Sequence, residues 1–119
     1  GPTKGDGYRY STSGEISFNE AARGISDLGE IVYAILVADG IVKIGWTTDL
    51  YNRFRNLRTC DGAVKVLGFT FGGHAEEMEI HKALHAHVAR GREYYHPAPE
   101  VMEVINGWRA AVGMDDIAA

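Results

Sequence analysis

The segment from Ile31 to Trp46 constrains the fold of this chain more than any other. It contains two runs of apolar and β-branched residues, IVYAILV and IVKIGW, which flank a turn with Asp39-Gly40. Asp-Gly between two such runs is a strong signal for a β-hairpin, because glycine adopts the left-handed backbone that tight turns require. The first run is apolar throughout, which is typical of a strand buried on both faces. We therefore predict a hairpin at the centre of a sheet.

The rest of the chain predicts helices and one further strand. Leu50, Phe54 and Leu57 recur at i, i+4 and i+7, the spacing of the buried side of a helix. The order of elements predicts an α+β fold, a small three-stranded antiparallel β-sheet flanked by helices. The predicted helices cover residues 18–28, about 49–58, 75–89 and 97–112, and the predicted strands cover 31–37, 41–46 and 64–71.

A chain of 119 residues is expected to form one domain. We predict a flexible lead-in with a short helix over residues 1–30, a folded domain over 31–112 and a frayed tail over 113–119. No apolar run approaches the roughly 18–20 residues of a membrane span, so we expect no membrane association. The single cysteine, Cys60, excludes an internal disulfide framework and favours a reducing, cytoplasmic location.

The charge distribution limits how this chain could bind nucleic acid. Its net charge is −4, whereas proteins that coat DNA nonspecifically are usually basic. The acidic excess lies at the ends, however, and Arg53, Arg55 and Arg58 cluster on one predicted helix. A nucleic-acid site would therefore be local, and we expect it to need a missing DNA-binding domain or a homodimer partner.

Three residues with chemically useful side chains surround the hairpin. Tyr33 lies on its first strand, Lys43 on its second, and Arg53 on the helix that follows. Each alone has an ordinary structural explanation, but the hairpin and helix can bring a phenol, an amine and a guanidinium to one place. Gly45, in the second strand, is typical of a position that backbone or a ligand approaches closely.

A second group of polar residues lies on the predicted helix over 75–89. Glu77, His81 and His85 follow one another at intervals of four, so they share one face and could bind a metal or relay a proton. His81 and His85 also have a spacing that suits zinc, whereas a plain exposed helix face is the simpler explanation. The aromatic segment 93–95 is adequately explained as core beneath a loop.

These motifs resemble the GIY-YIG nuclease superfamily, in particular the branch typified by a phage T5 reading frame and a yeast meiotically up-regulated protein. The GIY element corresponds to Ile31-Val32-Tyr33, and the YIG element to Lys43-Ile44-Gly45, in the KIG form common in that branch. The resemblance covers about residues 31–105. Its later motifs are Arg53 on the following helix, Glu77 and His81 at E-x-x-x-H spacing, and the Gly91–Tyr95 segment.

The resemblance implies a metal-dependent DNA endonuclease with one Mg²⁺ or Mn²⁺ ion. Glu77 would hold the metal, with Glu76 as the alternative ligand. Tyr33 would act as the general base, with its phenol acidified by Lys43. Arg53 would neutralise charge on the phosphoryl oxygens, and His81 would relay protons. The substrate contacts would come from Gly45, Arg55 and Arg58. Two other readings stay open: a catalytically inactive module that binds nucleic acid or protein, and a zinc-binding regulatory domain that uses His81 and His85.

Overall fold

The computed structural model describes residues 29–117 as an α+β fold around one antiparallel sheet. The strands are β1 (Ile31–Leu36), β2 (Val42–Thr47), β3 (Lys65–Phe71), β4 (Val88–Arg90) and β5 (Tyr94–Tyr95), in the order β3-β1-β2-β5-β4. The helices are α2 (Leu50–Asp61), α3 (His74–Ala83), α4 (Pro99–Ala111) and the 3₁₀ turn η1 (His85–His87). The predicted lead-in and its helix lie outside the described residues, apart from positions 29 and 30.

The predicted hairpin is confirmed. β1 and β2 pair antiparallel, and Tyr33 lies directly opposite Gly45. The turn is closed by a hydrogen bond from the Val37 amide to the Ile41 carbonyl, 3.0 Å from nitrogen to oxygen. Gly40 has a φ of 80°, the left-handed conformation that the Asp-Gly signal predicted.

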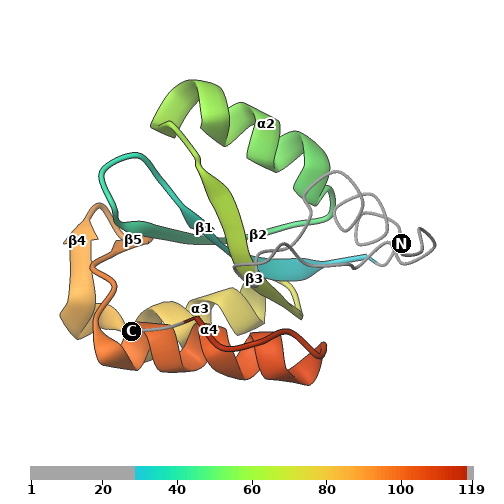
Figure 1. The fold of residues 1–119 in the computed structure, drawn as a ribbon, viewed down its shortest axis with the longest axis vertical. Helices are drawn as coiled ribbons and strands as arrows, with labels where there is room; N and C mark the ends of the chain where they lie inside the picture. Colours follow the sequence, from blue (N-terminus) through green and yellow to red (C-terminus); the bar gives the residue numbers. More distant parts are fainter. Residues whose placement is uncertain (1–28, 118–119) are drawn as a thin grey trace.

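The sheet separates two helical layers. Figure 1 shows α2 on one face, and α3 and α4 on the other. Because side chains alternate along a strand, β1 contributes to both layers. Tyr33 and Ile35 belong to the cluster that includes Phe54 of α2, whereas Val32 belongs to the cluster that includes Ile105 of α4. The prediction that β1 is a central, doubly buried strand is thus confirmed.

The predicted number of strands was wrong, because the segment after α3 adds two more. α3 ends at Ala83 rather than near Ala89, and a 3₁₀ turn leads into β4 and β5. β5 pairs with Val42 and Lys43 of β2, so it extends the sheet on that side. Strands of three and two residues are too short to show an alternation of apolar and polar residues in the sequence. Their position is set by pairing with β2, which is distant in the sequence.

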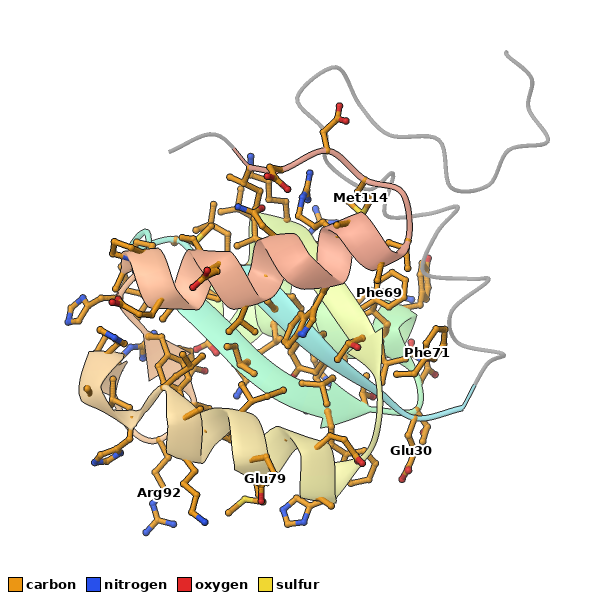
Figure 2. The ribbon with its side chains drawn as sticks, turned by 90° about the horizontal axis from the view of Figure 1, so that it is seen from below. Glu30, Phe69, Phe71, Glu79, Arg92 and Met114 are labelled. Carbon is orange, nitrogen blue, oxygen red and sulfur yellow. The ribbon has the colours of Figure 1, made fainter. Side chains whose placement is uncertain are left out.

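The chain after α4 packs against the domain, whereas the sequence predicted fraying from residue 113. Met114 is buried in the cluster that contains Phe69, and Figure 2 shows it beyond the end of α4 on the side of Phe69. The Ile117 amide donates to Asn106 Oδ1 at 2.7 Å, and Arg109 Nε donates to a tail carbonyl. These contacts hold the tail through residue 117.

No helix between residues 29 and 117 has the length and apolar composition needed to traverse a bilayer.

Candidate functional site

The closest approach at the candidate site is between Tyr33 and Gly45. A Cβ atom built on Gly45 would lie 2.5 Å from the Tyr33 hydroxyl oxygen and 2.8 Å from the ring carbon that carries it. Any side chain at position 45 would therefore displace the phenol. The group that approaches Gly45 is the Tyr33 side chain from the neighbouring strand, rather than the backbone or ligand that the sequence predicted.

Charged groups from three other elements act on this phenol. Burial raises the pKa of Tyr33, and the carboxylates of Glu93 and Glu77 raise it further, whereas the Arg53 guanidinium lowers it. The tyrosine is 1% exposed, which explains why burial dominates. The expected acidification by Lys43 is not what this environment produces, because the net effect on the pKa is upward.

Lys43 has a different partner from the one expected. Its ammonium forms an ion pair with Glu93 Oε1 and lies 4.8 Å from the centroid of the Tyr94 ring. The residue is only 9% exposed, so it does not point freely into solvent. A lysine buried to this degree requires a charge partner, and Glu93 supplies it.

Glu77, His81 and Glu93 converge on one point. One potential ligand atom from each residue lies within 4.8 Å of the others. Glu77 and His81 are one turn apart on α3, with 3.2 Å between Glu77 Oε2 and His81 Nε2, and Glu93 arrives from the segment before β5. Two carboxylates and an imidazole are together able to hold a divalent cation. We call these three residues the acid–histidine cluster.

Glu76 lies at the start of α3 and has a local structural role. Its Oε1 accepts a hydrogen bond from the Gly73 amide at 2.8 Å, which completes a capping interaction. This bond lowers the pKa of the exposed Glu76 carboxyl. Of the two adjacent glutamates, Glu77 is the one that faces His81.

The imidazole of His81 is fixed by Tyr95. The two rings stack with centroids 5.6 Å apart and an angle of 12° between their planes. His81 Nδ1 is hydrogen-bonded to the Tyr95 hydroxyl, which donates to the Arg92 carbonyl oxygen at 3.2 Å. These contacts leave Nε2 facing Glu77, the arrangement in which a neutral histidine can bind a cation.

The three arginines of α2 divide between two surfaces. Arg53 lies at the edge of the buried stripe, close enough to Tyr33 to lower the pKa of its phenol. Arg55 lies over the Tyr51 ring at 5.7 Å, and Arg58 lies over Phe54 at 5.9 Å. The structure therefore groups Arg53 with the site, whereas the other two pack along their own helix.

The sequence reasoning missed the contribution of residues 93–95. Glu93 completes the acid–histidine cluster, and Tyr95 orients its histidine. Tyr94 donates a hydrogen bond to an Asp61 carboxylate oxygen, which connects β5 to the end of α2. Burial and Asp61 raise the pKa of Tyr94 to about 12. The one local signal was a charged residue beside two aromatic residues, just after the glycine turn at Gly91.

The hypothesis that His81 and His85 bind zinc required both residues to lie on one helix, and the structure does not place them so. α3 ends before His85, which lies in η1 and is exposed. Within residues 29–117, His81 groups with two carboxylates rather than with a second histidine.

The comparisons with known proteins give no relative. No family model matches the chain, and no curated protein or solved structure matches it significantly.

Proposed function

We propose that this protein is a metal-dependent endonuclease that hydrolyses DNA phosphodiester bonds by a GIY-YIG-type mechanism. The observation that carries the proposal is the convergence of the Tyr33 hydroxyl and Arg53 with the acid–histidine cluster. These groups come from a strand, two helices and a loop segment. They are therefore brought together by the tertiary fold and not by the geometry of one helix or strand. The order of the same residues in the sequence resembles the GIY-YIG pattern, which independently supports the proposal.

A divalent cation fits the acid–histidine cluster. Glu77 and Glu93 offer oxygen ligands, and His81 offers Nε2, held toward Glu77 by the hydrogen bond at its other nitrogen. When bound, Mg²⁺ or Mn²⁺ supplies positive charge that polarises phosphoryl oxygens and acidifies a water. We assign Lys43 to holding the Glu93 carboxylate in place, through the ion pair described above.

Tyr33 is assigned to the attacking water. Because burial raises its pKa, the neutral phenol predominates, and the oxygen of a neutral phenol can accept a hydrogen bond from water and orient it. We assign proton acceptance to the same oxygen, coupled to donation of the phenolic proton to a carboxylate of the cluster. The glycine at position 45 leaves the space in which the hydroxyl lies.

Arg53 is assigned to the scissile phosphate. It is exposed on its helix, so a guanidinium there can meet two phosphoryl oxygens with parallel hydrogen bonds. The charge that develops on these oxygens during hydrolysis would be neutralised by a group already in position. Loss of such a donor typically costs about 10²–10³ in rate.

The partner and setting belong to the same proposal. DNA is the expected substrate, and a homodimer or an additional DNA-binding domain would supply the affinity that a net charge of −4 does not. We propose an intracellular location, which is compatible with the exposed free thiol of Cys60.

Plasmid nicking tests this proposal. Supercoiled plasmid incubated with the protein and Mg²⁺ or Mn²⁺ should convert to nicked and linear forms, and EDTA should stop the conversion. A Glu77→Gln/Arg53→Ala double variant should leave the plasmid supercoiled. Equal conversion by the wild type and the double variant would refute the proposal.

Two observations favour a second candidate, a non-catalytic module that binds nucleic acid. Glu93 is already neutralised by Lys43, and Tyr33 is almost inaccessible to solvent. Titration of a labelled duplex in metal-free buffer separates the two functions. Tight, salt-sensitive binding with no metal-dependent nicking would favour the module.

A further inference from the structure

The outward face of α2 has an unusual composition. Asn52, Arg55, Asn56 and Thr59 line a shallow, open groove on this helix. Their spacing of i, i+3, i+4 and i+7 places them on one stripe, opposite the buried stripe of Leu50, Phe54 and Leu57. We call these four residues the outer stripe. All four have side chains that donate hydrogen bonds, and none is a carboxylate.

The charge on this helix is opposite to that of the chain. α2 contains three arginines and one acidic residue, Asp61 at its last position, whereas the whole chain has a net charge of −4. A local excess of positive charge on one exposed helix is complementary to a polyanion that contacts the molecule at that place.

The outer stripe is continuous with the proposed catalytic site. Successive residues of a helix are about 100° apart, so Asn56 lies about 60° around the axis from Arg53, one turn along. A polyanion whose phosphate meets Arg53 would therefore have its next contacts on Asn56 and Asn52. The Asn52 side-chain amide donates to Asp49 Oδ2 at 2.6 Å, which fixes its orientation at the start of the helix.

The side chains of the outer stripe match the edges of base pairs. Asparagine pairs with adenine, arginine with guanine, and threonine with either, through hydrogen bonds in the major groove. That groove is about 12 Å wide and admits one α-helix, whose diameter with side chains is about 10–12 Å.

We propose that the outer stripe of α2 docks in the major groove of duplex DNA, with Arg55 and Asn56 contacting base edges next to the scissile phosphate. This inference rests on the proposed nuclease function for the position of the cut. The docking itself is measured by binding, which requires no cleavage.

Binding of a labelled 24-base-pair duplex in EDTA, followed by fluorescence anisotropy, tests the docking. Arg55→Ala should weaken binding about tenfold and reduce the slope of log affinity against log salt concentration by about one. Asn56→Ala should weaken binding about tenfold with the salt slope unchanged. Lys82→Ala, which removes an exposed cation from α3, is the matched control and should bind like the wild type.

Two results would overturn the docking. In the first, the α2 variants bind the duplex as tightly as Lys82→Ala does. In the second, they lose the same affinity for single-stranded DNA of the same sequence, which has no major groove.

Cleavage of a randomised duplex library with Mn²⁺ separates this inference from the nuclease proposal. Wild-type products should show a base preference beside the cut, and Asn56→Ala should reduce it while still cleaving. Cleavage with an unchanged preference would refute the docking alone. Absence of cleavage together with weakened binding by the α2 variants would refute hydrolysis alone.

Discussion

Two places in this molecule bury charged side chains, and they do so differently. Arg109 of α4 is 1% exposed, and its Nε and Nη1 donate to the carbonyl oxygens of Asp115 and Leu67 at 2.7 and 2.6 Å. In the acid–histidine cluster, by contrast, the buried Glu77 faces an imidazole and lies near a second carboxylate. The first arrangement connects the tail to β3, whereas the second gathers ligands around one point.

The difference shows that burial of charge alone does not identify a functional site. Arg109 donates to two backbone carbonyls, so this guanidinium connects chain segments that are distant in sequence. Each of the carboxylates of Glu77 and Glu93 has about four lone-pair sites that can accept hydrogen bonds. The contacts with His81 and Lys43 occupy only some of these sites. Carboxylate oxygens that lie close together are the ligands that a hard cation requires.

The largest effect is expected from Glu77→Gln, which removes the negative charge of the cluster while keeping the shape of the side chain. Nicking should fall to background, because the cation would lose its most buried carboxylate ligand. Glu79→Gln, an exposed position on the same helix, is the matched control and should nick normally. If Glu77→Gln nicked plasmid like Glu79→Gln, the cluster would have no role in hydrolysis.

A smaller loss is expected from Arg53→Ala. Removal of a preorganised donor to the phosphoryl oxygens should lower the nicking rate by about 10²–10³-fold, with partial recovery in Arg53→Lys. Arg58→Ala removes an arginine that lies over Phe54 on the same helix, and it should lose less than tenfold. Single-turnover nicking measures all three rates, and equal losses in the two alanine variants would contradict the assignment of Arg53.

Arg109→Met tests the claim that the buried charge of Arg109 stabilises the fold and has no part in the candidate site. Two carbonyl oxygens would lose their donor, so the free energy of unfolding should fall by about 1–3 kcal/mol. Urea unfolding followed by circular dichroism measures this change. The folded variant should still nick plasmid at the wild-type rate at 20 °C, and a loss of nicking without a loss of stability would mean that Arg109 belongs to the site.

The smallest effect concerns stability at high pH in metal-free buffer. Burial raises the pKa of Tyr33 and brings that of Tyr95 to about 12, above the value of about 10 for an unfolded tyrosine. Stability from these neutral phenols is complete below about pH 10 and is lost as pH rises toward 12. Urea unfolding at pH 9, 10 and 11 should show a decline that Tyr95→Phe reduces and Arg109→Met leaves unchanged. An equal decline in Tyr95→Phe would contradict this origin.

The parts of the fold that the sequence predicted are those with strong local patterns. The hairpin, α2, β3 and α4 each have six or more residues with clear periodicity or a capping signal. β4 and β5 could not be predicted, because they exist through pairing with each other and with β2. The end of α3 was missed because the apolar spacing of Leu84 and Val88 continues past it.

The same distinction applies to the candidate site. Helical spacing was enough to place Glu77 beside His81. The hairpin signal was enough to pair the strand of Tyr33 with the strand of Lys43. Glu93 was missed because only the pairing of β5 with β2 brings it near them. The direction of the Tyr33 pKa shift was also predicted wrongly, since it depends on burial and on the partner that Lys43 selects.

The central claim is that Glu77, His81 and Glu93 hold a divalent cation facing Tyr33. Anomalous diffraction from a crystal soaked in Mn²⁺ tests it most directly. We predict one strong peak bonded to Glu77 and to at least one of the other two ligands, on the side of the Tyr33 hydroxyl. A saturating soak that leaves the cluster without a peak, in crystals of a protein that nicks DNA with Mn²⁺, would contradict the claim.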